Sequence, residues 1–188
     1  MRARRLSYII AILLTITACK EENEFSMEYQ CRFFFDTNIH NTSIIKNALN
    51  PMATGIFVSV SQNWGSGGAR TIHAELNDGR TRENVDITTA RETAITYVMG
   101  ANNGLLIGYS LLGNGLFAFD KQCPNCLKEF NQANYLMDWD NSGMYVKCKK
   151  CGRRYNLNNS GFCVDDGKAR KLIRYRASYD GNILSVHN

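Results

Sequence analysis

The sequence predicts an all-β domain, because short segments with the two-residue periodicity of strands alternate with turn residues along most of the chain. Branched side chains occupy every second position from Ile56 to Ser61, and Ile72, Ala74 and Leu76 share one face of a second segment. Asn77-Asp78-Gly79 then ends that segment with residues that favour turns. Many short strands separated by turns are typical of a sandwich or a barrel.

The other expected elements follow from the same signals. Ile95–Met99 is a candidate strand that Gly100 closes. Two hairpins are expected, because pairs of apolar segments flank short glycine-containing turns. They join Gly104–Tyr109 to Leu116–Phe119 through Gly113-Asn114-Gly115, and Leu172–Tyr179 to Ile183–Val186 through Asp180-Gly181. The only helix expected is Asn41–Asn50, where Ile44, Ile45 and Leu49 lie on one side.

Length and charge indicate one domain with no nucleic-acid partner. The 188 residues can bury one core, and the only two prolines, Pro51 and Pro124, leave no proline-rich linker. Arg2, Arg4 and Arg5 stand in a segment without acidic residues, so the formal charge of +5 falls to +2 after residue 18. So weak a balance does not predict nucleic-acid binding.

The first nineteen residues resemble the signal of an exported bacterial lipoprotein. The three arginines precede the apolar run Tyr8–Leu14, which is too short to span a membrane but suits a signal peptide. Ile16-Thr17-Ala18-Cys19 resembles the lipobox, in which small residues expose the cleaved bond and the cysteine thiol is acylated. We therefore expect a signal peptide at 1–18 and lipidation of Cys19. An ordinary secretory signal that contains a cysteine is the alternative.

Residues 19–28 are expected to form a flexible tether, since they are polar and poor in apolar side chains. The chain would then be anchored in the cell envelope by lipid, in the outer membrane of a bacterium. The acidic residues Glu21 and Glu22 resemble a signal for export to the cell surface. A solvated linker explains them equally well.

Two C-x-x-C pairs predict a metal site. The pairs are Cys123-Pro124-Asn125-Cys126 and Cys148-Lys149-Lys150-Cys151, with 21 residues between them. Two tight turns of this kind can direct four soft thiolates at one ion, which zinc favours. Nearby basic residues would offset the negative charge of such a centre, and Gly152 suits a turn that needs a positive φ. Those basic residues are Lys149, Lys150, Arg153 and Arg154.

Other chemistries for the cysteines remain open. An exported protein meets oxidising conditions, so the pairs can also form disulfides. The Cys123–Cys126 pair also has a proline, as thioredoxin-like redox centres do, but Leu127–Phe130 offers little helix to follow it. Cys31 and Cys163 are left over and can form a disulfide with each other.

The second half of the chain resembles the Rieske family. A Rieske domain has a strand, a loop with Cys-x-His, a second loop with Cys-x-x-His-Gly, and strands that return to the base. Leu116–Asp120 is similar to the first strand, Cys123 and Cys126 stand at the first loop, and Cys148–Gly152 is similar to the second loop. Tyr155, Leu157 and Gly161, the Leu172–Tyr175 strand and the Asp180-Gly181 hairpin with Val186 continue the similarity across residues 104–188.

The resemblance implies one Rieske-like antiparallel β-sandwich at 29–188, with a small zinc-ribbon-like metal-binding subdomain at 121–165. It also shows a departure, because cysteines stand where the two ligand histidines would be, and His40, His73 and His187 all lie outside the two loops. A Rieske cluster therefore cannot form with its own ligands. Four thiolates can still hold zinc, a single iron or a plant-type 2Fe-2S cluster.

The expected function is that of a non-enzymatic lipoprotein in which zinc is a structural ion. Four thiolates leave no open position for water, which argues against hydrolytic zinc chemistry, and no catalytic constellation stands out. The domain would then bind an unidentified protein or glycan. The alternative is electron transfer through an iron or 2Fe-2S centre on the same four cysteines.

Overall fold

The structure, a computed structural model, describes residues 24–65, 68–113, 115–140 and 143–188, so the expected signal peptide and Cys19 lie outside the described residues. The fold is mostly β and its sheets are antiparallel, which confirms the predicted class. The strands are β1 (Cys31–Asp36), β2 (Phe57–Trp64), β3 (Arg70–Leu76), β4 (Arg82–Ile87), β5 (Val98–Met99), β6 (Gly104–Tyr109), β7 (Leu116–Asp120), β8 (Met137–Trp139), β9 (Tyr145–Cys148), β10 (Arg154–Asn156), β11 (Phe162–Cys163), β12 (Arg174–Tyr179) and β13 (Ile183–His187). Within these described ranges, three short helices accompany the strands, α2 (Ile45–Ala48), α3 (Ala90–Thr93) and α4 (Pro124–Phe130).

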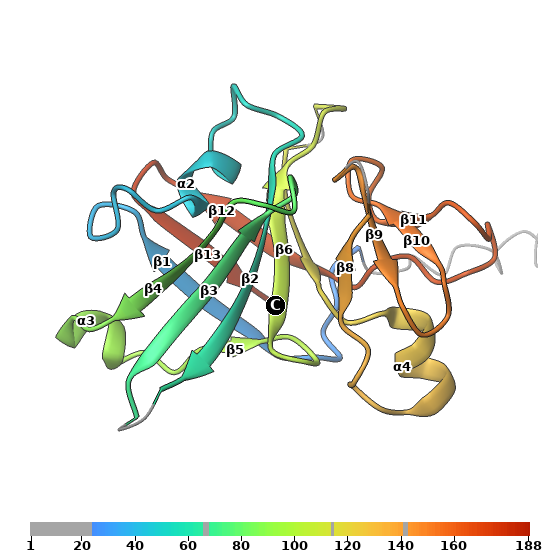
Figure 1. Ribbon diagram of the computed structural model, residues 1–188, viewed down its shortest axis with the longest axis horizontal. Coiled ribbons are helices and arrows are strands. Elements are labelled where there is room, and N and C mark those ends of the chain that lie inside the picture. The colour runs from blue at the N-terminus through green and yellow to red at the C-terminus, as the bar shows by residue number, and fades with distance from the viewer. Residues whose placement is uncertain (1–23, 66–67, 114, 141–142) are drawn as a thin grey trace, which may run out of the picture.

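A nine-stranded sheet forms the body of the domain, in the order β4-β3-β2-β6-β7-β12-β13-β1-β5. The sheet bends back on itself, so that β1, β12 and β13 cross behind β2, β3 and β4 in Figure 1. Phe33 and Phe35 of β1 and Val58 and Val60 of β2 therefore belong to one buried cluster between the two halves. The alternation of β3 puts Ile72, together with its neighbours at every second position, in the same core.

A smaller sheet, in the order β11-β10-β9-β8, packs with α4 on the outside of the large one. Successive residues of a strand point to opposite faces. Leu105 of β6 therefore enters the inner core, whereas Leu106 joins Phe117 and Phe119 of β7 in the outer core. This second core contains three of the paired cysteines, so the large sheet is the platform on which the cysteine loops rest.

Several elements differ from the expected ones. The expected strand at Ile95–Met99 is reduced to Val98–Met99, and the Asn41–Asn50 helix to Ile45–Ala48. The hairpins β6–β7 and β12–β13 form as expected. β1 was not expected, because Phe34 interrupts its polar alternation. β4 was not expected, because charged residues, which are depleted in strands, dominate it.

The last part of the expected tether lies against the domain. The Ser26 amide donates a hydrogen bond to the Arg174 carbonyl at 2.8 Å. The Asn188 side-chain amide donates to the carbonyls of Ser26 at 2.6 Å and Tyr29 at 3.0 Å. Ser26 and Tyr29 therefore have fixed partners, which the polar composition of this segment does not reveal.

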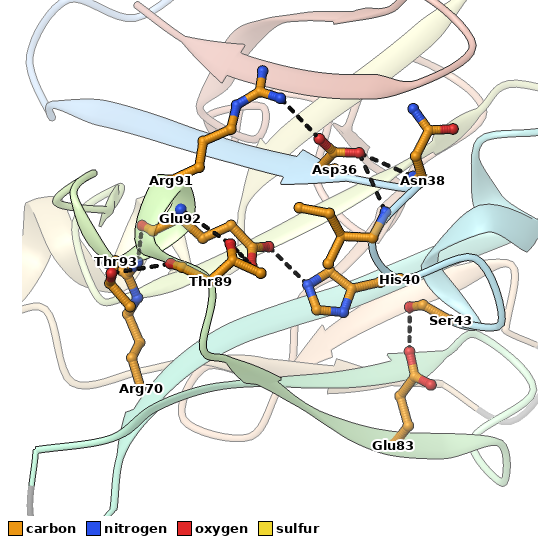
Figure 2. A network of polar contacts seen from close by, with 11 residues as sticks. Asp36, Asn38, His40, Ser43, Arg70, Glu83, Thr89, Arg91, Glu92 and Thr93 are labelled. Atoms are coloured by element: carbon orange, nitrogen blue, oxygen red, sulfur yellow. Dashed lines mark hydrogen bonds and ion pairs between the residues drawn. The ribbon is translucent and has the colours of Figure 1, made fainter.

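A polar network holds α3 to the edge of the sheet (Figure 2). His40 contacts the Glu92 carboxylate at 2.7 Å, and the Thr89 hydroxyl donates to the other oxygen at 2.7 Å. The buried Arg70 guanidinium donates to the carbonyls of Glu92 and Ile95 and lies over the Tyr97 ring. In the described part of the chain, no helix has both the length and the apolar character needed to cross a membrane.

Candidate metal centre

The first C-x-x-C pair lies where β7 gives way to α4. Cys123 precedes the helix, Pro124 occupies its first turn, and Cys126 follows on the same turn. Proline suits this position because the first helical amide needs no partner within the helix. The expectation of little helix after Cys123 is therefore wrong, and the presence of α4 makes this pair compatible with a redox centre.

The second pair occupies the turn between β9 and β10. Cys148 is the last residue of β9, and Cys151 lies three residues further on. The Gly152 amide donates to the Cys148 carbonyl at 2.9 Å, and Gly152 has a φ of 75°. Residues with a side chain resist a positive φ, whereas glycine does not. The glycine after the last cysteine therefore allows this turn, as its position predicted.

The four sulfurs converge on one point. Cys123 Sγ lies 3.8 Å from Cys151 Sγ, Cys126 Sγ lies 3.7 Å from Cys148 Sγ, and all four lie within 4.8 Å of one another. Zinc–sulfur bonds of about 2.3 Å place the corners of a regular tetrahedron about 3.8 Å apart. The closest pairs match that spacing, so the residues present fit a single tetrahedral ion.

Burial controls the protonation of these thiols. Cys123, Cys126 and Cys148 are fully buried and Cys151 is half-buried. Burial raises the pKa of Cys123 to about 11 and also raises the pKa of Cys126. At Cys151 burial also acts to raise the pKa, but hydrogen bonds from the Arg153 amide and guanidinium outweigh it and lower the pKa to about 7. A metal that binds here must displace protons from Cys123 and Cys126.

Of the four basic residues expected to offset the charge of the centre, one hydrogen-bonds to a cysteine of the pair. Arg153 contacts Cys151. Lys149 instead pairs with Asp138 at 2.9 Å, and Arg154 pairs with Asp165 at 2.7 Å. Lys150 lies over the Phe130 ring at 5.1 Å. The charge balance near the sulfurs therefore depends chiefly on Arg153.

The sequence analysis missed a group that supports the site. The Asn125 amide donates to the Tyr155 hydroxyl at 2.8 Å, which leaves the hydroxyl proton free to point at Cys123 Sγ, 3.4 Å away. A proton donor of this kind stabilises a thiolate ligand and fixes its orientation. The aromatic position after the second loop was identified in the sequence, but nothing in the chain's pattern shows that its hydroxyl returns to the first loop.

Asp120 is a second group that the sequence analysis missed. It ends β7, three residues before Cys123, and is fully buried. The amides of Ala101 and Gln122 and the Tyr175 hydroxyl donate to its carboxylate at 2.7, 2.8 and 2.9 Å. These three donors act to lower the pKa of Asp120, but burial outweighs them and raises it to about 6.

The remaining cysteines and histidines lie apart from the centre. Cys31 and Cys163 are free thiols in different cores, so the disulfide left open by the sequence is not present in the structure. His40 contacts Glu92, and His73 contacts Asn84 at 2.9 Å. His187 is exposed near the C-terminal end of the chain.

The chemistry of the centre is set by its donors. Across the described ranges, the four cysteines are the only group of three or more histidine, cysteine or acidic side chains placed to share an ion. Four thiolates suit zinc or iron.

No family model matches the chain, and no curated protein or solved structure matches it either.

Proposed function

We propose that the protein is an exported lipoprotein, anchored through Cys19, whose β domain holds one structural zinc ion and binds a partner at the cell envelope. The convergence of the four sulfurs within 4.8 Å carries the metal part of the proposal. A zinc with four protein ligands has no position for a substrate or water, so a catalytic role is not supported. The ion would instead hold two loops together and contribute folding free energy.

The same spacing favours a single ion over a 2Fe-2S cluster. In such a cluster each iron holds two of the four thiolates, so thiolates on opposite irons are separated by the whole cluster core. Here every pair of sulfurs lies within 4.8 Å, and the closest contacts join the two loops. This arrangement supports zinc or one iron, and zinc is preferred because a closed tetrahedron of four thiolates is typical of structural zinc sites.

Chain order supports the Rieske-like part of the proposal. β7 and β12 pair side by side in the large sheet, and the chain between them forms the four-cysteine unit. The unit that contains both cysteine loops is thus inserted between two adjacent strands of one base, as the resemblance implies. The substitution of cysteine for histidine would make the centre a structural descendant of a redox site.

A cavity on the body of the domain supports the binding part. It has a volume of about 330 Å³ and lies on the outer face of β1, β12 and β13, next to α3. Phe34 lies opposite Ser185, which lies opposite Ser178, so a ring and two hydroxyls form one row across three strands. Asp36 and Arg91, 3.4 Å apart, form part of the polar lining (Figure 2). Such a mixture suits a polar ligand with an apolar face, as a glycan has.

Metal analysis tests the proposal most directly. Protein purified without its signal peptide is expected to contain one zinc per chain and to show no visible absorption, because zinc has no accessible second oxidation state. Element analysis and an absorption spectrum on the same sample give the result. Iron with charge-transfer bands would replace the structural proposal with the electron-transfer one.

Lipidation is tested separately. Cys19→Ala is expected to move the protein from the membrane fraction to the soluble fraction, because the acylated thiol is its proposed anchor. Cys163→Ala is the matched control, since it removes a cysteine outside both the anchor and the metal group. Retention of the Cys19 variant in membranes, at the level of this control, would refute the anchor.

A further inference from the structure

A basic groove lies where the chain emerges toward Cys19. The groove has a volume of about 610 Å³ and is bounded by residues 24–29, by α4 and by residues 170–174. Its charged side chains are Lys128, Arg170, Lys171 and Arg174, against Glu24 and Glu28. Arg174 pairs with Glu24, and the lining as a whole has two more basic than acidic side chains.

The length of the chain limits how far this groove can lie from a lipid anchor. Glu24 lies five positions after Cys19, and five extended residues span at most about 18 Å. From residue 24 onward the chain is held to the domain. Arg174 and Arg176 both lie over the Phe25 ring, and Ser26 is hydrogen-bonded to β12 and Asn188.

We infer that this groove is the face of the domain that rests on the membrane, where its basic side chains bind the headgroups of anionic phospholipids. The inference rests on the proposed lipidation of Cys19. Charge complementarity supports it, because basic residues near a surface of anionic lipid each strengthen binding about fivefold. Met27 supports it too, since this residue is 70% exposed, lines the groove and can enter the headgroup layer.

The orientation has a consequence for the metal centre and the cavity. α4 carries both Cys126 and Lys128, so the first cysteine loop would lie close to the lipid surface. The cavity is lined in part by residues of α3, which lies across the molecule from α4 in Figure 1, so it would face away from the membrane. A partner could then reach that cavity while the domain stays on the lipid.

Amine acetylation of the full lipidated protein tests the orientation. Lys128 and Lys171 are expected to react about fivefold more slowly in native membranes than after transfer to detergent. Lys46, on α2, which lies away from α4 in Figure 1, is expected to react equally in both samples. Mass spectrometry of the digested protein measures all three sites. Equal reactivity of Lys128 in the two samples would overturn the inference.

A charge reversal tests the role of the lipid charge. In the K128E/R170E variant, Lys171 is expected to lose its protection from acetylation in membranes. In the K46E/R80E variant, which has the same change in net charge, Lys171 should stay protected. Protection that survives in K128E/R170E would overturn the role of the headgroups. Fractionation of the same cultures separates the two proposals: a protein absent from membranes contradicts the anchor, whereas an anchored protein with a reactive Lys128 contradicts only the orientation.

Discussion

Replacement of Cys126 by serine is expected to abolish zinc binding and to unfold the small sheet. Its sulfur lies in the first turn of α4 and within 3.7 Å of Cys148, on the opposite loop. A structural zinc contributes on the order of 10 kcal/mol of folding free energy, which is comparable with the whole stability of a domain. The melting temperature should therefore fall by at least about 10 °C. Zinc content and a thermal melt measure the two effects.

Cys163→Ser is the matched control for this experiment. Cys163 packs against the same core but lies outside the four-sulfur group, so its replacement should leave the zinc in place and change the melt little. A chelator should lower the melting temperature of the wild type and of Cys163→Ser but not that of Cys126→Ser. An unchanged melting curve for Cys126→Ser would show that the ion is not a structural support.

The fold was predictable where one face of a strand is buried and the other is polar. The hairpins β6–β7 and β12–β13 were found because glycine or aspartate turns separate two apolar segments. β4 was missed because its position at the sheet edge exposes charged side chains, and only Val85 and Ile87 of this strand are buried. α4 was missed although Pro124 is a recognised helix-start signal, because the following residues show no long periodicity.

The site was predictable in its ligands but not in its supports. C-x-x-C spacing is local information, and it identified the four residues that the structure brings together. Tyr155 and Asp120 act over long sequence separations, through Asn125 and Tyr175, and such contacts exist only once the strands have paired. Whether a basic residue lies near a sulfur also depends on the fold, which directs Arg153 to Cys151 and Arg154 to Asp165.

Asp120 is expected to make the stability of the domain fall as the pH rises. Burial raises its pKa from the ordinary value of 3.8 to about 6, so the folded protein prefers the protonated carboxyl. Below pH 3.8 the group is protonated in both states and costs nothing, and the penalty then grows until the pH passes about 6. A difference of about two pKa units corresponds to a loss of about 3 kcal/mol in the free energy of unfolding.

Asp120→Asn should remove this dependence, because asparagine is neutral at every pH. It also loses one of the hydrogen bonds to the Ala101 and Gln122 amides, which costs about 1 kcal/mol at all pH values. The difference in unfolding free energy between variant and wild type should therefore shift in favour of the variant between pH 4 and pH 7. Denaturant unfolding at several pH values measures it, and protonation of the metal ligands cancels because it affects both proteins alike.

Asp78→Asn provides a control of opposite sign. The Thr81 hydroxyl and amide lower the pKa of this exposed carboxyl, so its contribution to stability is present above the ordinary pKa and is lost as the pH falls. Its difference curve should change only at the acidic end and in the other direction. If the Asp120 difference curve stays flat between pH 4 and pH 7, the carboxyl is charged in the folded protein throughout, and its three donors outweigh the cost of burying it.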